Sequence, residues 1–296
     1  ALEQPERYSL ASVIADTELS ISQPSGEPWQ PRNFDRVAHG EVLLFKALSK
    51  SYNLATARLG MDLGIDAVVD MLRRLGIEHY IPEVPALTLG AGEYSPFDMA
   101  TMYQTIASGG YRTPLKTIRT VLDARGEIDT RYELTYDREV SLQAVYLLQY
   151  ALIDVMRNGT GRGAYRSVPD TLTLAGKTGT TNNGRDSWFA GFSGDLLTVS
   201  WVGRDDNGGT GLTGSSGALK VWSHFMGAAS KRSLAYNMPE GLAVQTIDTS
   251  NGYLTGEGCP NAQSMPFMEG SQPRRNTNCS PKKSGIRDWF QSLFGH

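Results

Sequence analysis

Two short motifs carry side chains suited to acyl transfer, and both stand where elements of the chain meet. The first is Ser51-Tyr52-Asn53 and the second is Lys177-Thr178-Gly179-Thr180. A serine hydroxyl can relay a proton when a cation lies beside it, and Lys177 could be that cation. The Asn53 amide offers a donor and an acceptor, so it could hold a substrate amide and a nearby lysine together. The alternative is that Ser51 and Asn53 only cap a helix and that Lys177 is a surface residue.

The second motif continues an expected strand, Thr171–Gly176, and strand geometry assigns its side chains to two faces. Successive side chains of a strand point to opposite faces, so Thr178 and Thr180 share one face and Lys177 occupies the other. The two hydroxyls could bind a substrate carboxylate in an open groove. Gly179 allows close backbone approach of an extended peptide, and the Thr180 N–H could stabilise an oxyanion. We therefore expect the Lys177 ammonium to reach the Ser51 hydroxyl.

Hydrophobic periodicity places these motifs in an α+β chain. Helical spacing predicts helices near 41–50, from Asn53, over 65–75, from the Ser95-Pro96 cap signal to 109, from Ser141 to 158, and over 218–229. Three short strands joined by turns lie between 171 and 202 and favour an antiparallel meander. The expected fold is an antiparallel sheet flanked by helices, plus a helical subdomain, with residues 1–40 irregular.

Composition excludes several functions. The net charge is −3 and the basic residues are dispersed, so no nucleic-acid partner is expected. The four histidines are isolated and the two cysteines are far apart, so no metal or other cofactor is expected. No apolar run is long enough for a membrane span, and the chain starts at Ala1 without a signal peptide. We expect an internal fragment or a processed product.

The chain is expected to divide near residue 235. Residues 1–235 form the main domain, and 236–296 form a small C-terminal region rich in Gly, Pro, Ser and Asn. A disulfide between Cys259 and Cys279 would stabilise this region in an oxidising compartment, with free thiols as the alternative. Residues 286–293 form a short amphipathic stretch that could dock on its own domain, on a partner or on a membrane surface.

Four blocks of this chain resemble the transpeptidase domain of the class A penicillin-binding proteins, in the order in which that family has them. They lie at 41–60, 87–100, 158–164 and 176–191. The opening from Tyr8 and the tail with the two cysteines are most similar to the Gram-negative type 1b members.

The resemblance implies a penicillin-binding transpeptidase or serine β-lactamase-like fold and a role in a bifunctional peptidoglycan synthase. Ser51 and Asn53 would be its second catalytic motif, and Lys177, Thr178 and Thr180 its third. The substrates would be D-Ala-D-Ala stem peptides, and β-lactam antibiotics would acylate the same site. The resemblance implies a protein on the periplasmic side of the bacterial inner membrane. Its glycosyltransferase domain and membrane anchor would lie outside this chain. An outer-membrane lipoprotein activator would be a further candidate partner.

The family's nucleophilic Ser-x-x-Lys is expected just before Ala1. The chain's one Ser-x-x-Lys starts at Ser280 and has Pro281 where a helix should run, so we reject it as the nucleophile. Two other functions stay open: a DD-carboxypeptidase or β-lactamase that uses water as acceptor, and a non-catalytic peptidoglycan-binding domain. No Glu-x-x-x-Asn motif stands between the two motifs to serve as a β-lactamase general base.

Overall fold

A three-stranded antiparallel sheet forms the centre of one half of the molecule. The computed structural model describes residues 1–23, 26–277 and 279. The sheet has the order β7-β8-β9, with β7 at Ala175–Thr180, β8 at Ser187–Phe192 and β9 at Leu197–Val202. The expected meander is confirmed, although β7 begins at Ala175 rather than at Thr171. As an edge strand, β7 carries the Lys-Thr-Gly-Thr motif at its open side.

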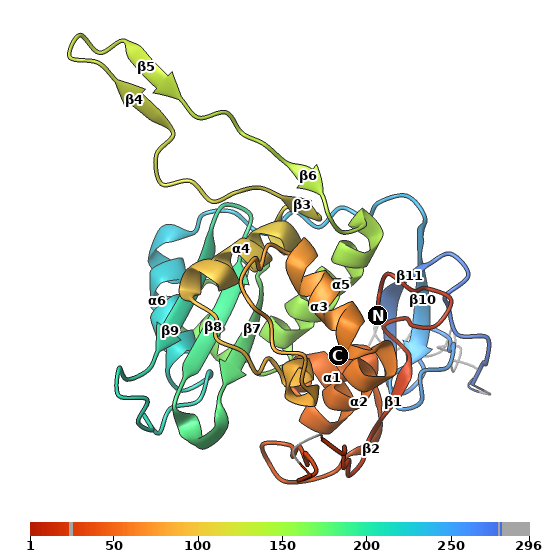
Figure 1. The fold of residues 1–296 in the computed structure, drawn as a ribbon. Helices are drawn as coiled ribbons and strands as arrows, with labels where there is room; N and C mark the ends of the chain where they lie inside the picture. Colours follow the sequence, from red (N-terminus) through yellow and green to blue (C-terminus); the bar gives the residue numbers. More distant parts are fainter. Residues whose placement is uncertain (24–25, 278, 280–296) are drawn as a thin grey trace, which may run out of the picture.

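Helices cover both faces of this sheet (Figure 1). Helix α6, Ala218–Ala229, packs on one face, where the Trp222 and Phe189 ring centroids are 4.7 Å apart. Helices α4, Pro96–Ala107, and α5, Leu142–Arg157, pack on the other face. Strand alternation therefore buries Phe189 under α6 and Phe192 against α5.

A helical half stands beside the sheet. It contains α1 at Leu44–Lys50, α2 at Asn53–Leu63, α3 at Ile65–Arg74 and a 3-10 turn at Pro85–Leu89. Helix α1 packs on α5, which in turn packs on β7. Helix α5 is thus the element that sets the distance between the first motif and the second.

Capping residues in the sequence correctly predicted where α4 and α5 begin. Ser95 caps α4 in a capping box with Asp98, and the Ser141 side chain caps α5. Residues 1–40 are not wholly irregular, because β1, Val13–Asp16, pairs antiparallel with β2, Gly40–Leu43. This pairing joins segments far apart in the sequence, which no local pattern announces.

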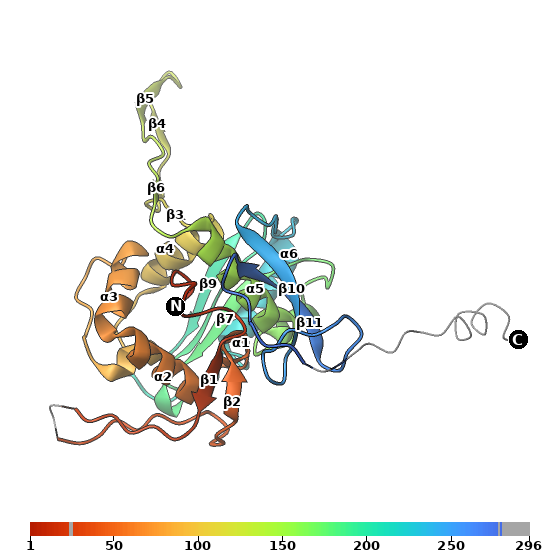
Figure 2. The same cartoon turned by 90° about the vertical axis from the view of Figure 1, so that its right-hand side faces the viewer.

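The C-terminal region contains a hairpin that the sequence did not indicate. Strands β10, Leu242–Asp248, and β11, Ala262–Met268, pair antiparallel and lie alongside α5 (Figure 2). Leu242 and Phe267 share a buried cluster with Leu147 of α5. The Cys259–Cys279 disulfide is present, as expected. The amphipathic stretch 286–293 and the rejected motif at 280–283 lie outside the described residues.

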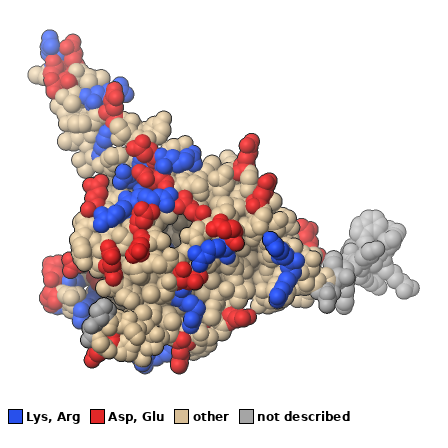
Figure 3. All heavy atoms as spheres, turned by 45° about the vertical axis from the view of Figure 1, so that its right-hand side comes forward, with Lys and Arg blue, Asp and Glu red and all other residues tan. Residues whose placement is uncertain are grey.

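A long arm projects from the body between α4 and α5 (Figure 1). Its base is the pair β3, Tyr111–Arg112, and β6, Asp137–Arg138, and its tip is the pair β4, Thr120–Leu122, and β5, Ile128–Arg131. Acidic and basic side chains are interspersed over the arm and the face of the body in Figure 3. That face therefore carries no extended patch of one sign.

The part of the chain that the structure describes has neither a membrane-spanning helix nor a cluster of metal-binding side chains. No helix in residues 1–23 and 26–277 is long and apolar enough to cross a membrane. In that same part of the chain, no group of three or more His, Cys, Asp or Glu side chains is placed to hold a metal ion.

Candidate active site

Ser51 forms the junction between α1 and α2 in an unusual backbone conformation. Its φ of 58° and ψ of 48° lie in the left-handed region, where a residue with a Cβ is held at a cost of roughly 1–3 kcal/mol. The Ser51 N–H donates to the Leu48 carbonyl and the Tyr52 N–H donates to the Ala47 carbonyl, which closes the last turn of α1. The abrupt turn directs the Ser51 hydroxyl toward β7.

The segment after α5 ties this junction to the sheet. The Lys50 ammonium donates to the Asn158 carbonyl at 2.5 Å, and the Thr160 N–H donates to the Ser49 carbonyl at 3.2 Å. At Gly159, a Cβ would lie 2.2 Å from the Ser49 carbonyl oxygen, so only glycine allows this approach. The Thr160 hydroxyl then lies 2.7 Å from the Thr178 hydroxyl on β7.

Lys177 reaches Ser51 as strand alternation predicts. Its ammonium donates to the Ser51 hydroxyl and, at 3.0 Å, to the Thr178 carbonyl. Both acceptors are neutral, and burial lowers the pKa of Lys177 from 10.5 to about 8. A lysine with such a pKa can donate and accept a proton near neutral pH. The pair can therefore move a proton between a hydroxyl and a substrate amine.

The two threonines face the other side of the sheet. Thr178 pairs with Phe189 and Thr180 with Ser187, so their side chains share the α6 face. We expected both hydroxyls to line an open groove, but each already has a partner. The Thr178 hydroxyl bonds to Thr160, and the exposed Thr180 accepts the Gly214 N–H at 2.8 Å. A substrate carboxylate would join or replace these bonds.

Glycines bring a loop close to the motif. A Cβ on Gly214 would lie 2.7 Å from the Gly179 carbonyl oxygen and 2.9 Å from the Thr178 Cβ. The loop before α6 therefore lies directly against β7. At Gly179 itself, a Cβ would lie 3.1 Å from the Trp188 Cβ, so a side chain there would crowd β8. The close approach of an extended peptide to Gly179 stays a prediction.

Asn53 occupies a different position from the one expected of a cap. It is the first residue of α2, Tyr52 is the capping position, and the Tyr52 side chain makes no cap hydrogen bond. The Asn53 side-chain NH₂ donates to the Arg32 carbonyl at 2.8 Å. The described residues contain no hydrogen bond between Asn53 and Lys177. The interpretation of Ser51 and Asn53 as mere caps of α2 is wrong, because neither side chain bonds to the free amides of that helix.

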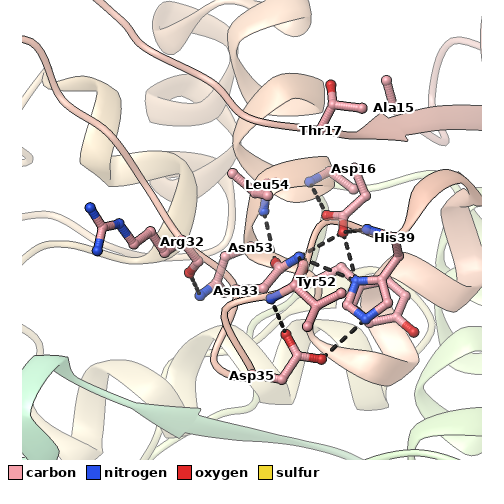
Figure 4. A network of polar contacts seen from close by, with 12 residues as sticks. Ala15, Asp16, Thr17, Arg32, Asn33, Asp35, His39, Tyr52, Asn53 and Leu54 are labelled. Atoms are coloured by element: carbon pink, nitrogen blue, oxygen red, sulfur yellow. Dashed lines mark hydrogen bonds and ion pairs between the residues drawn. The ribbon is translucent and has the colours of Figure 1, made fainter.

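Two residues that the sequence analysis missed accept those amides instead. The Asn33 side-chain oxygen accepts the Leu54 N–H at 3.2 Å, and the Asp16 carboxylate accepts the Ala55 N–H at 2.9 Å (Figure 4). They lie 21 and 39 residues before their partners. Helix caps are predicted from residues next to the helix start in the sequence, so no local signal marks Asn33 or Asp16.

Comparisons with known proteins agree with this geometry. Residues 9–202 match the family model described as the penicillin binding protein transpeptidase domain. The chain is 37% identical over 295 residues to penicillin-binding protein 1B of Vibrio cholerae, covering 99% of this chain and 37% of that protein. It is 35% identical over 324 residues to penicillin-binding protein 1B of Escherichia coli, covering all of this chain and 38% of that protein.

A solved structure supports the fold. The crystal structure of penicillin-binding protein 1A from Haemophilus influenzae matches with a TM-score of 0.85 at 26% identity, over 93% of this chain and 47% of that one. The chain thus spans less than half the length of each of these three relatives. The family model covers well over half of the chain, and this chain belongs to the penicillin-binding protein transpeptidase domain family.

Proposed function

We propose that this chain is part of a serine-type D-Ala-D-Ala transpeptidase that cross-links peptidoglycan stem peptides. The contact between the Lys177 ammonium and the Ser51 hydroxyl carries the proposal. It joins two motifs from different halves of a chain that belongs to the transpeptidase family. In this site Ser51, Asn53 and Lys177 are catalytic, and Thr178, Gly179 and Thr180 bind substrate.

The reaction proceeds through an acyl-serine. A nucleophilic serine outside this chain gives its hydroxyl proton to the lysine of its own Ser-x-x-Lys motif and attacks the penultimate D-Ala carbonyl, and the bond to the terminal D-Ala breaks. Ser51 passes a proton to the departing amine, and Lys177 replaces it on the hydroxyl. The amine of a neighbouring stem peptide then attacks the acyl-serine and loses its proton by the reverse path to Ser51 and Lys177. The released serine takes its proton back from the lysine of its motif.

Substrate recognition falls to the edge strand and its loop. An extended stem peptide pairs with the open edge of β7 beside Gly179. The Thr178 and Thr180 hydroxyls bind the substrate carboxylate, and the Thr180 N–H contributes to the oxyanion site. Asn53 holds the substrate amide with its side-chain oxygen, since its NH₂ is already bound to Arg32.

An apolar cavity beside α1 has room for a few side chains of the helix that would carry the nucleophile. The cavity measures about 280 Å³. Its walls include side chains of α1, α2, α3 and α5, among them Leu48, Leu59, Met71 and Leu148. Apolar side chains of a helix packed against this face would fill the space.

The remaining partners follow from the relatives. Proteins named penicillin-binding protein 1B match the whole chain, so β-lactams are proposed ligands of the complete site. We place the complete protein on the periplasmic side of the inner membrane, with a glycosyltransferase domain and an anchor outside this chain and an outer-membrane lipoprotein as activator. Residues 1–235 form the transpeptidase portion of this scheme, and 236–296 are a small C-terminal region.

Covalent labelling with a fluorescent penicillin tests the proposal. The complete protein should be labelled, because its nucleophile meets the Ser51–Lys177 pair, whereas isolated 1–296 should stay unlabelled. Lys177→Ala in the complete protein should slow labelling roughly 100-fold or more, the scale of one lost proton-transfer or electrostatic group.

Asp70→Ala serves as the control variant because Asp70 lies on α3 and is exposed. Its labelling should match that of the unaltered protein. Labelling of isolated 1–296 would contradict the assignment of the nucleophile to a segment outside this chain. Unchanged labelling of Lys177→Ala would remove Lys177 from the catalytic group.

A further inference from the structure

A buried polar cluster holds the first motif from outside its own helices. It consists of Asp16 at the end of β1 and of Asn33 and His39 in the loop that leads to β2 (Figure 4). Asp16 and Asn33 are 0% and 4% exposed. Buried polar groups are expensive unless each is bonded, so their arrangement is tightly constrained.

Asp16 is the centre of this cluster. One carboxylate oxygen accepts the Ala55 N–H at 2.9 Å. The other accepts the Asn33 NH₂ at 2.6 Å, the His39 N–H at 2.9 Å and the His39 ring nitrogen Nδ1 at 2.8 Å. Burial alone would raise the pKa of Asp16, but these hydrogen bonds hold the pKa below its usual range. A fixed negative charge thus stands at the N-terminus of α2, where the helix dipole favours it.

Each of four successive residues of the motif region is held by this part of the chain. The His39 ring stacks on the Tyr52 ring, with centroids 4.0 Å apart, and the Asn53 NH₂ bonds to the Arg32 carbonyl. The next two backbone amides are accepted by Asn33 and Asp16, as described above. The other ring nitrogen of His39, Nε2, lies 3.1 Å from Asp35, which fixes the ring itself.

This scaffold explains how the left-handed conformation of Ser51 persists. The capping residue of α2 makes no side-chain hydrogen bond to the helix. Without acceptors from other segments for its free N–H groups, the first turn could unwind and release Ser51 from its conformation. We propose that Asp16, Asn33 and His39 are positioning residues for acyl transfer, which hold Ser51 against Lys177 and orient Asn53 toward substrate. This inference rests on the proposed function.

The test compares Asp16→Asn with a matched variant, Asp195→Asn. Asp195 also accepts a backbone N–H, from Lys231 at 2.9 Å, and two hydroxyls, from Ser193 and Ser230. It lies in the turn between β8 and β9, at the opposite end of the sheet from Thr180. Both changes remove one charge from a bonded carboxylate, but only the first is beside the motif.

The first measurement is the rate of labelling of the complete protein by a fluorescent penicillin, resolved into noncovalent affinity and the first-order acylation constant. Asp16→Asn should lower the acylation constant roughly 10- to 100-fold, the scale of a small misplacement of catalytic groups. Affinity should change less, and Asp195→Asn should react like the unaltered protein. An unchanged constant in Asp16→Asn, or an equal loss in Asp195→Asn, would overturn the proposal.

A milder variant covers the case in which Asp16→Asn does not fold. His39 is only partly buried, and His39→Ala removes the stack on Tyr52 and one bond to Asp16. It should lower the acylation constant in the same direction by a smaller factor. A folded His39→Ala protein with normal acylation would count against the cluster.

A second measurement separates this inference from the proposed function. Amide hydrogen exchange of 1–296 needs no nucleophile. Asp16→Asn should speed exchange at 51–55 and leave α5 unchanged. Should the complete unaltered protein resist labelling, the proposed function fails while exchange still decides the positioning role. Unchanged exchange at 51–55 would refute it.

Discussion

Lys177 is a cation in surroundings that disfavour its charge. Its ammonium has two neutral acceptors, Ser51 and the Thr178 carbonyl, and no carboxylate of the described residues forms an ion pair with it. Desolvation is therefore not offset, and the pKa of Lys177 falls to about 8. Burial of this lysine lowers the stability of the folded chain, and the lowered pKa lets its proton move near neutral pH. Such shifts are common in active sites.

This shift predicts how stability depends on pH. Between about 8 and 10.5, Lys177 is neutral in the folded chain and still protonated in the unfolded chain. The unfolded state binds more protons there, so the free energy of unfolding should rise with pH through that range. Urea unfolding of 1–296 and of Lys177→Met at several pH values isolates the effect, because the other titrating groups are common to both. A difference between the two proteins that is flat, or that falls with pH, would contradict the shift.

The residue scale also shows where sequence reasoning succeeds. Strand alternation alone predicted that Lys177 faces away from Thr178 and Thr180, because that rule needs only adjacent positions. It did not predict Asp16, Asn33 and His39. Their partners lie tens of residues away, and a lone aspartate or histidine has no spacing to read.

Helices and strands divide in the same way, into those predicted from local signals and those that depend on distant partners. Helices α4 and α5 carry their own start signals, Ser95 and Ser141, and were located from sequence. The pairs β1–β2 and β10–β11 depend on partners that come together only in the fold. The first motif was therefore predicted from the local sequence pattern, whereas strand β1, which supports it through Asp16, was not.

The disulfide makes a prediction about the β10–β11 element. Cys259 lies in the loop between the two strands and Cys279 lies beyond β11, with a sequence separation of 20 residues. Closing a loop of that size restricts the unfolded chain, so reduction should lower the free energy of unfolding by about 3 kcal/mol. Denaturant unfolding with and without a reductant measures this.

A double variant provides the control for that experiment. Cys259→Ser/Cys279→Ser should have the stability of the reduced protein and should not respond to the reductant. An oxidised and a reduced chain of equal stability would show that the bridge does not restrain the unfolding unit that is measured.

At the scale of the whole molecule, the two motifs and the packed body lie apart from the arm. Helix α5 connects the helical half, the sheet and the C-terminal hairpin, so both motifs depend on one central helix. The arm over 111–138 stands outside that arrangement (Figure 1). Its β4 and β5 strands pair with each other, and Leu122 and Ile128 at its tip are 56% and 59% exposed.

The arm should therefore be dispensable for folding of the body. Trypsin should cut first at its exposed basic residues, Arg119, Arg125 and Arg131, and the nicked chain should stay folded. Replacing 116–134 by a short Gly-Gly turn should change the free energy of unfolding by less than about 1 kcal/mol, because exposed apolar side chains contribute little burial. None of the five tryptophans lies in the arm, and Trp188, Trp201 and Trp222 lie in β8, β9 and α6, so tryptophan fluorescence reports unfolding of the body. Loss of the cooperative transition in the shortened chain, or initial cleavage within the sheet, would mean that the arm belongs to the folding unit.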